Sequence, residues 1–305
     1  MKWEKKGLIY KPPFDGSWKD NSALTPTPFL LTEDIIRIYA SFRDTNGIGR
    51  IGFVDLDANN PSIILRISEK PVLDIGQDGM FDDNGVILGD LIKIDNMVYM
   101  YYIGFQLVKK AKFLAYTGLA ISNDSGETFV RKSVTPILDR LDNATLFNAV
   151  HTIMYENNIF KVWCGAGSAW QKINDIDYPS YIVQYYESSD GINFNTQGYK
   201  KCITFIENEY RIGRPRVYKD NNKYKMFYTY GTVEGKYEMG YAESNDGVNW
   251  NRLDSEIGIT LSQDGWDSKS ISYGVPIVIK DKVYMFYNGN EMGKEGFGYA
   301  ELVQE

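Results

Sequence analysis

Histidine, cysteine and proline are scarce in this sequence, which contains 1 His, 2 Cys and 10 Pro among its 305 residues. Two cysteines cannot build a disulfide framework, and their spacing matches no metal-finger motif, so we expect Cys164 and Cys202 to be free thiols buried in strands. No apolar run is long enough for a secretory signal or a membrane span, which predicts a cytoplasmic protein without a membrane partner. Basic residues are outnumbered, with 33 Lys and Arg against 40 Asp and Glu, and this disfavours broad nucleic-acid binding.

Aromatic residues and glycine are abundant instead, with 23 Tyr, 15 Phe, 6 Trp and 28 Gly. Aromatic residues favour strands and glycine favours tight turns, so this composition indicates short strands joined by turns. Hydrophobic residues make up 43% of the chain and charged residues 24%, which is typical of a folded globular protein and excludes wholesale disorder. The length allows one large domain or two small ones.

One three-residue motif occurs five times along the chain: an apolar residue, then an aromatic residue, then a small residue or a tyrosine. The copies are Ile38-Tyr39-Ala40, Met100-Tyr101-Tyr102, Val162-Trp163-Cys164, Met226-Phe227-Tyr228 and Met285-Phe286-Tyr287. Their first members are 62, 62, 64 and 59 residues apart, so the spacing is even over the whole chain. Such a period predicts five copies of one structural unit.

Each copy of the unit contains more than its aromatic strand. Another strand precedes it across a polar turn, in which Asn and Asp tolerate the backbone angles of a hairpin. These turns are Asp95-Asn96, Asn157-Asn158, Asn221-Asn222 and Asp281-Lys282. A third strand follows the aromatic one, and a Ser-rich turn then leads into a fourth. Four strands in each unit of about 60 residues predict an all-β fold, a five-bladed β-propeller that residues 1–305 form as a single domain.

The N-terminal segment supplies a strand that the last unit lacks. The fifth unit ends at GYAEL, without the aromatic-led fourth strand of the other units. The segment WEKKGLIYKP resembles those fourth strands and aligns Trp3 with aromatic residues such as Phe129 and Trp250. We therefore expect residues 2–11 to pair with the last blade and close the ring.

Three aspartates lie in turns that match a known structural motif. The stretch SNDSGETF, residues 122–129, matches the Asp-box turn of sialidase-type propellers, in which a carboxylate accepts backbone hydrogen bonds. Asp190 and Asp246 occupy the same place in SSDGINF and SNDGVNW as Asp124 does in the first turn. We expect all three to be structural rather than catalytic.

The segments that lead into the innermost strands are the place to look for a site. In a propeller these strands line a central channel, and ligands usually bind in the funnel where the loops converge. The five leading segments are SWKDNSALTP, DGMFDDNGVI, ATLFNAVHTI, NEYRIGRPRV and DSKSISYGVP. All five hold polar or charged residues, and these residues differ from blade to blade. The divergence indicates a functional site.

Carboxylates from different blades are the candidates for catalysis. Cleavage of a glycosidic bond needs one ionised and one protonated carboxyl group facing the same cavity. The candidates are Asp20 from the first leading segment, Asp83 from the second and Glu209 from the fourth. Glu207 and Glu209 flank a single residue at the start of a strand, and we expect at most one of them, Glu209, to face inward.

Seven further residues are candidates for substrate binding: Arg43, Asp82, Asn148, His151, Trp170, Arg214 and Tyr273. Inward arginines suit a carboxylate or a phosphate group. Trp170 lies in a long loop of the third blade and suits stacking on the face of a sugar.

Structural alternatives stay open for several of these residues. Asp82 can cap a turn, His151 can be a core residue, and Arg43 can be a strut between blades. Trp170 can anchor its own loop. Arg214 and Arg216 share a strand face, and we expect one of them to brace a neighbouring blade through a buried ion pair.

Three kinds of segment carry a family resemblance: the strands VYMYYIGF, YKMFYTYG and VYMFYNGN, the turns SSDGINF and SNDGVNW, and the segment DGMFDDNGV. They resemble the five-bladed propellers of glycoside hydrolase families 43, 32, 68 and 130 over nearly the whole chain. The resemblance implies a glycoside hydrolase-like enzyme in which Asp20 is the base or nucleophile, Asp83 the orienting carboxylate and Glu209 the acid. It implies a carbohydrate substrate and no cofactor, with a calcium ion near His151, as family 43 can hold, as an alternative.

The third leading segment contains LFNAVHT, with no carboxylate where many such hydrolases carry their acid. Two alternatives to hydrolysis therefore stay open. Arg214, Arg216, Lys269 and His151 suit a phosphate-dependent glycoside phosphorylase, which resembles family 130. The other alternative is a propeller that binds a glycan or a nucleotide sugar without catalysis. The sequence predicts neither the sugar nor the oligomeric state.

Overall fold

The computed structural model describes residues 1–304, and its regular structure is almost entirely β. The helical elements are the short helix α1 (Asn290–Gly293) and two 3₁₀ turns, η1 (Thr196–Gly198) and η2 (Asp254–Glu256). The all-β prediction is therefore confirmed. No helix within residues 1–304 is long and apolar enough to cross a membrane.

The strands follow one another along the chain in antiparallel groups of four. The first group contains β2 (Ser22–Thr32), β3 (Ile35–Arg43), β4 (Gly49–Asp57) and β5 (Ile64–Ile67). The second group contains β6 (Val86–Ile94), β7 (Met97–Leu107), β8 (Phe113–Ser122) and β9 (Val130–Arg131). The third contains β10 (Phe147–Glu156), β11 (Ile159–Ile173), β12 (Ile176–Ser188) and β13 (Lys200–Ile203). A short parallel pairing of β10 with β8 joins the second and third groups into one sheet.

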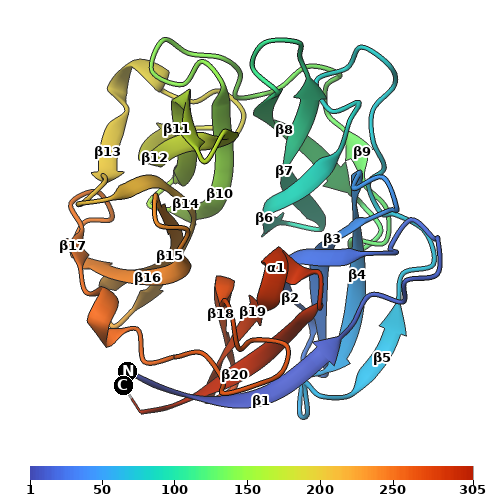
Figure 1. Ribbon diagram of the computed structural model, residues 1–305. Helices are drawn as coiled ribbons and strands as arrows, with labels where there is room; N and C mark the ends of the chain where they lie inside the picture. Colours follow the sequence, from blue (N-terminus) through green and yellow to red (C-terminus); the bar gives the residue numbers. More distant parts are fainter. Residues whose placement is uncertain (305) are drawn as a thin grey trace.

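The last two groups complete the arrangement. The fourth contains β14 (Glu209–Asp220), β15 (Lys223–Thr232), β16 (Tyr237–Ser244) and β17 (Asn251–Arg252). The fifth contains β18 (Ser272–Ile279), β19 (Lys282–Asn288) and β20 (Phe297–Gln304), together with β1 (Lys2–Tyr10) from the start of the chain. Figure 1 shows the groups around a common centre, in chain order from blue to red, with the two ends of the chain close together.

The N-terminal strand pairs where the sequence predicts. β1 runs antiparallel to β20, with Trp3 opposite Leu302 and Tyr10 opposite Phe297. Trp3 and Tyr10 are both buried, Trp3 in the apolar cluster shared with the fourth group and Tyr10 in the cluster shared with the first. The expected pairing of residues 2–11 with the last unit is confirmed at the level of strand contacts.

Apolar side chains fill the space between neighbouring groups. One buried cluster joins Tyr39 of the first group to Tyr102 of the second, and another joins Tyr284 of the fifth group to Phe42 of the first. Comparable clusters lie between the second and third, the third and fourth, and the fourth and fifth groups. Because each sheet buries aromatic residues against both of its neighbours, most of the many aromatic side chains in this protein pack between groups of strands.

The predicted hairpin turns are present, with one displaced by a residue. Asp95, Asn157 and Asn221 have positive φ values of 54°, 54° and 46°, which Asn and Asp tolerate better than other side chains. In the last hairpin the positive φ, 56°, falls on Lys280. β18 ends at Ile279 and β19 begins at Lys282, so this turn comes one residue earlier than predicted.

The three Asp-box aspartates have the structural role that the sequence predicts. Oδ1 of Asp190 accepts the backbone N–H groups of Ile192 and Asn193 at 2.8 and 2.7 Å. Asp124 and Asp246 accept equivalent pairs of backbone hydrogen bonds in their own turns. Backbone donation from Asn193 holds the pKa of Asp190 below its usual range, so the carboxylate stays ionised as an acceptor.

Both cysteines are free, as predicted. Cys164 on β11 is buried and Cys202 on β13 is half-buried. Burial raises the pKa of the Cys202 thiol to about 12 and raises that of Cys164 well above its usual value. Neither residue is a thiolate nucleophile at neutral pH.

Candidate functional site

A cavity of about 160 Å³ lies where the innermost strands β2, β6, β10, β14 and β18 begin, and we call it the central cavity. Its lining residues are Leu24, Thr25, Arg43, Ile87, Ile103, Phe105, Phe113, Ala115, Phe147, Ala149, His151, Gly165, Pro179, Tyr181, Arg214, Tyr237, Tyr273 and Met292. No Asp or Glu of residues 1–304 is among them. The cavity is therefore aromatic and cationic, without an acidic group in its wall.

Each of the five innermost strands carries an irregularity in its pairing beside this cavity. The irregularities fall at Thr25-Pro26 on β2, Gly89 on β6, His151 on β10, Arg214-Pro215 on β14 and Tyr273-Gly274 on β18, and each strand has one residue more than its partner there. A β-bulge redirects the side chain that it carries. Thr25, Arg214 and Tyr273 have positive φ values of 55°, 55° and 59°, which cost non-glycine residues about 1–3 kcal/mol each. The bulges thus present Thr25, His151, Arg214 and Tyr273 to the cavity.

A polar side chain from the preceding group supports the backbone at or near every bulge. Each accepts a backbone N–H hydrogen bond, at 2.7–3.1 Å. The acceptor and donor pairs are Ser41 with Leu88, Thr117 with Val150, Thr152 with Val217, Thr229 with Tyr273, and Asn288 with Thr25. In the last pair the fifth group supports the first.

Arg214 and His151 form the polar centre of the wall. Nη1 of Arg214 donates to the backbone oxygen of Leu88 at 2.6 Å and lies 3.2 Å from Nδ1 of His151. Because a guanidinium only donates, Nδ1 accepts and the ring carries its proton on Nε2. Burial, together with the charges of Arg214 and Arg216, lowers the pKa of His151 well below its usual value, so the imidazole is neutral at neutral pH.

Arg43 and Arg214 line the cavity without a carboxylate partner anywhere in residues 1–304. Burial lowers the pKa of Arg43, and it lowers that of Arg214 to about 10, so both stay charged at neutral pH. The guanidinium carbon of Arg214 lies 5.6 Å from the ring centre of Tyr273, and the hydroxyl of Tyr237 donates to that of Tyr273 at 2.8 Å. These groups offer a ligand positive charge and hydroxyl hydrogen bonds.

Aromatic rings form another part of the wall. Phe113 and Phe147 contact each other at 5.6 Å between ring centres, and Phe147 contacts Tyr181 at 6.0 Å. Trp170 packs on Phe113 and Phe147 at 4.9 and 5.4 Å, but it does not line the cavity. The structure places Trp170 on β11 and not in the predicted loop, and there it supports two rings of the wall. Its stacking on a ligand stays a prediction.

Four of the seven predicted binding residues meet at this one place: Arg43, His151, Arg214 and Tyr273. Their contacts with a ligand stay predictions. The predicted buried ion pair is present, because Nη2 of Arg216 lies 2.8 Å from Oδ1 of Asp90 on β6. It joins the fourth group to the second.

Asp82 and Asn148 do not line the cavity, contrary to expectation. Asp82 is buried in a turn, with Oδ2 at 2.8 Å from Nε of Arg131. Asn148 is buried between Phe147 and Ala149, which both line the cavity. Since side chains alternate along a strand, Asn148 points away, and its Nδ2 donates to the backbone oxygen of Asp139 at 3.1 Å.

The three predicted catalytic carboxylates also lie outside the wall, so this cavity does not bring them together, and their catalytic roles stay predictions. Oδ1 of Asp20 accepts the N–H of Gly16 at 2.7 Å, and Oδ2 of Asp83 accepts that of Gly79 at 2.9 Å, both within turns. Oε1 of Glu209 lies 2.6 Å from Nη2 of Arg252.

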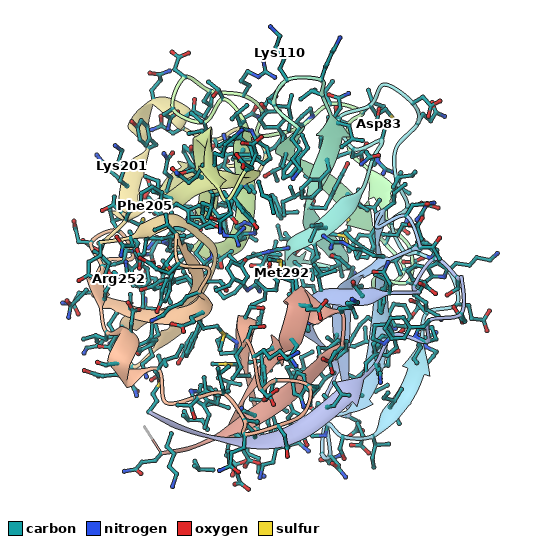
Figure 2. All side chains as sticks on the ribbon, in the orientation of Figure 1. Asp83, Lys110, Lys201, Phe205, Arg252 and Met292 are labelled. Atoms are coloured by element: carbon teal, nitrogen blue, oxygen red, sulfur yellow. The ribbon has the colours of Figure 1, made fainter. Side chains whose placement is uncertain are left out.

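Their distance along the chain explains this placement. Each carboxylate precedes the first cavity residue of its strand by four or five positions, as Glu209 precedes Arg214. Glu209 and Arg214 lie on the same strand, β14, where five positions at roughly 3.3 Å per residue span roughly 17 Å. Asp20 and Asp83, by contrast, lie in turns before their strands. In Figure 2, Asp83 and Arg252 lie away from the centre, where Met292 lies.

The residues near His151 do not suit a calcium ion. Calcium takes six to eight oxygen ligands, with carboxylates among them. The nearest charged groups to the ring are the guanidinium groups of Arg214 and Arg216, and no carboxylate of residues 1–304 lines the cavity. Within the same residues no cluster of three or more His, Cys, Asp or Glu side chains forms a metal site.

Sequence reasoning missed several residues of the wall, including Tyr181, Tyr237, Phe113 and Met292. These residues lie outside the five leading segments, on other strands and loops that the fold brings to the centre. Two of the bulges could have been predicted from the sequence. Pro26 and Pro215 lie inside strands, where proline indicates an edge strand or a bulge.

The chain shares its fold with glycoside hydrolases of known structure. It matches a structure named as a BT0996 RGII complex with a TM-score of 0.71 and 19% identity, over 99% of this protein and 92% of that one. It matches a glycoside hydrolase with a TM-score of 0.69 and 19% identity, over 98% and 90%. A thermostable family-43 glycoside hydrolase matches with a TM-score of 0.66 and 18% identity, over 96% and 90%. At these identities the likeness shows the fold.

Sequence comparison gives a more direct relationship. No family model matches the chain. The uncharacterized protein Rv1502 of Mycobacterium tuberculosis, strain ATCC 25618 / H37Rv, is 31% identical over 303 residues, which cover 99% of both chains. The uncharacterized protein MT1551 of strain CDC 1551 / Oshkosh has the same identity and coverage. The chain therefore belongs to the protein family of Rv1502 of Mycobacterium tuberculosis.

Proposed function

We propose that the protein is a five-bladed propeller of glycosidase fold whose central cavity binds a carbohydrate that carries an anionic group. The observation that carries this proposal is the presence of Arg43 and Arg214 in the cavity wall with no carboxylate partner in the described residues 1–304. We favour binding over the hydrolysis that the carboxylates of the leading segments suggest, because none of those carboxylates lines the cavity.

The five four-stranded groups are the blades in this interpretation. The pairing of β1 with β20 and the hydrogen bond from Thr25 to Asn288 both support a ring closed between the last blade and the first. The apolar cluster that contains Tyr284 and Phe42 supports the same closure. A closed ring explains why side chains from all five groups meet in one cavity.

Two features support a carbohydrate ligand. The fold is shared with glycoside hydrolases, and one of the similar structures is named as an RGII complex. The cavity also combines aromatic faces such as Phe113 and Tyr181 with a few polar groups, which is the usual composition of a small-molecule site.

The polar groups support an anion on that carbohydrate. Guanidinium groups bind carboxylate and phosphate in forked geometry, and a buried cation without a partner is costly. Nε2 of His151 adds a neutral donor, since Nδ1 already accepts from Arg214.

Calorimetric titration with pairs of neutral and anionic forms of the same sugar tests the proposal. We expect the anionic form to bind more tightly, and Arg43→Gln to weaken its binding about tenfold or more, because a charge-assisted hydrogen bond is lost. Asp83→Asn is the matched control, since Asp83 lies outside the cavity wall, and it is expected to bind like the unmodified protein. Equal binding of neutral and anionic forms, or full binding by Arg43→Gln, contradicts the proposal.

Glycoside cleavage is a second candidate, favoured by the fold shared with glycoside hydrolases. Hydrolysis by two carboxyl groups needs them about 5–5.5 Å or about 6.5–9.5 Å apart across the bond. Asp20, Asp83 and Glu209 are the groups that this candidate requires, together with a ligand site beyond the central cavity. A cationic cavity also suits inorganic phosphate as the nucleophile, which is the phosphorolytic form of the candidate.

Product analysis separates these possibilities. Oligosaccharides are incubated with and without inorganic phosphate, and the products are examined for free sugar or sugar 1-phosphate. Hydrolysis predicts free sugar in both cases and its loss in Asp83→Asn, whereas phosphorolysis predicts sugar 1-phosphate only with phosphate. No turnover with any oligosaccharide, combined with tight binding of an anionic sugar, favours binding alone.

A further inference from the structure

We propose that the anionic group of the ligand is a phosphoryl group carrying two negative charges, so that the ligand is a phosphorylated sugar. This inference rests on the proposed function, because it specifies the chemical class of the ligand in the same cavity. It comes from the way in which the chain pairs its arginines.

The sequence contains ten arginines, and six of them contact a carboxylate at 2.6–3.0 Å. These six are Arg37, Arg50, Arg66, Arg131, Arg216 and Arg252. A seventh, Arg140, is exposed and donates to the hydroxyl of Tyr116 at 3.1 Å. Where an arginine is structural, the fold thus gives it an acid or leaves it in solvent.

The remaining three arginines lie together at the central cavity. Arg43 and Arg214 line it, and Arg211 lies behind one of its tyrosines, with the guanidinium carbon 4.3 Å from the ring centre of Tyr237. None of the three contacts a carboxylate within the described part of the chain, residues 1–304. Uncompensated charge is therefore concentrated at this one place.

Arg211 strengthens this conclusion. Its side chain is buried, with 8% of the residue exposed, and rings of Tyr178, Tyr210 and Tyr237 surround its guanidinium. Nε of Arg211 is buried and has no hydrogen-bond partner. A buried arginine cannot lose its charge, so the cost of burying Arg211 is offset by the surrounding tyrosines, Tyr181 among them, and by an anion nearby.

Arg216 provides an internal comparison. It lies two residues after Arg214 on the same strand, and it is paired with Asp90 at 2.8 Å. The chain therefore places an acid beside one of two neighbouring arginines and none beside the other. A structural role explains Arg216, and a ligand explains Arg214.

The charge count selects the class of anion. A carboxylate neutralises one guanidinium, so of the two cations in the wall, or three with Arg211, one or two then stay unbalanced in a low-dielectric site. A phosphomonoester carries nearly two negative charges at neutral pH and three acceptor oxygens, which match two guanidinium groups and the Nε2–H donor of His151.

Calorimetry at fixed ionic strength tests this inference with four probes for each of several hexoses: the neutral sugar, its uronate, its 1-phosphate and its 6-phosphate. Inorganic phosphate is the fifth probe. We expect at least one phosphorylated sugar to bind about tenfold or more tightly than the uronate and than inorganic phosphate. Arg43→Gln should remove most of this preference, whereas Arg140→Gln, an exposed matched control, should keep it.

The pH dependence gives an independent signature. The second ionisation of a phosphomonoester lies near pH 6, so affinity should fall by up to about tenfold between pH 7.5 and pH 5. The protein groups that face the ligand are Arg43, Arg214, His151 and the tyrosines Tyr181, Tyr237 and Tyr273. Burial keeps His151 neutral and raises the pKa of Tyr181 and Tyr237, so none of these three groups titrates between pH 5 and pH 7.5. The fall in affinity therefore reports the ligand.

Each other outcome overturns a specific statement. A uronate that binds as tightly as any phosphorylated sugar overturns the phosphoryl assignment and leaves the proposed function standing. Inorganic phosphate that binds as tightly as the phosphorylated sugars overturns the assignment to a sugar phosphate. If no sugar binds in any form while the protein is folded, the proposed function itself fails.

Discussion

Nη1 of Arg214 lies 3.2 Å from Nδ1 of His151, and this contact sets the tautomer of the only histidine in the chain. A guanidinium has N–H donors and no acceptor atom, so Nδ1 of His151 accepts the hydrogen bond and Nε2 carries the proton. Nε2 lies beside Gly165, where an added Cβ would be 3.3 Å away, and Gly165 lines the central cavity. The histidine thus acts as a fixed neutral donor. It is not a proton shuttle at neutral pH.

The buried histidine makes stability depend on pH. Burial lowers the pKa of His151 well below its usual value, so below pH 6.5 the unfolded chain binds a proton that the folded chain does not. Stability is therefore full above pH 6.5 and falls as the pH drops. We expect His151 to account for a loss of about 1 kcal/mol in unfolding free energy between pH 6.5 and pH 5.5.

Urea unfolding at the two pH values measures this loss in the unmodified protein and in His151→Gln. The variant should show a smaller difference between pH 6.5 and pH 5.5, because the chain contains no other histidine. Equal differences in the two proteins would show that the folded chain also protonates His151.

Asn288 should be among the most sensitive positions in the fold. Its side chain accepts from Thr25 N–H at 2.7 Å and donates to the backbone oxygens of Ala23 and Gly296 at 2.8 Å. Asn288→Ala leaves three backbone groups without partners, two of them at the bulge of β2, so we expect a loss of about 3 kcal/mol or more. Exposed Asn193, which makes one side-chain bond to Asp190, is the control, and Asn193→Ala should cost less than about 1 kcal/mol. Similar losses in both variants on chemical denaturation would contradict a special role for the bulge.

The ion pair of Arg216 and Asp90 should couple two groups of strands. Both side chains are about nine-tenths buried, at 11% and 10% exposed, so removing one partner leaves an uncompensated charge. We expect Arg216→Met to cost about 3–5 kcal/mol. In the double variant with Asp90→Leu the loss should be smaller than the sum of the two single losses, by about 0.5–3 kcal/mol. Additive losses in a double-mutant cycle would show that the pair is not coupled.

The N-terminal strand should stabilise the whole molecule through its buried face. Trp3 is 6% exposed and lies 6.0 Å from the ring of Phe227, so Trp3→Ala should cost about 3–5 kcal/mol. Leu8 on the same strand is 39% exposed, and Leu8→Ala should cost about 1 kcal/mol or less. Thermal and denaturant unfolding compare the two. One cooperative transition at lower denaturant is expected for Trp3→Ala, and an unchanged midpoint would remove β1 from the stabilising contacts.

The sequence predicts local structure well for particular residues and the site less completely. Asp95 and Asn157 indicate hairpin turns because their side chains tolerate positive φ, and the structure has positive φ at both. Trp3 indicates a strand because its segment repeats the pattern of other fourth strands, and β1 pairs with β20. These features depend on neighbours along the chain or on a repeated pattern, which a sequence displays directly.

The site required information that no local pattern holds. Asp83 and Glu209 belong to the leading segments, but neither carboxylate lines the cavity. That of Asp83 accepts a backbone hydrogen bond in its own turn, and that of Glu209 pairs with the guanidinium of Arg252. A few residues further on, the bulge at Arg214 presents its side chain to the cavity with no acid beside it. Which side chain reaches the centre depends on bulge positions and on partners from other groups of strands.

The amino-acid sequence determined the all-β class, the period of about 60 residues, the turns, the two free thiols and the lone histidine on an innermost strand. These follow from side-chain chemistry and from spacing along one chain. Only the tertiary structure decided that arginines without acids, and not paired carboxylates, meet at the centre. The reason is physical: the net charge of a cavity depends on which distant side chains pair with each other, and Glu209 pairs with Arg252 while Arg43 and Arg214 have no acid to pair with in residues 1–304.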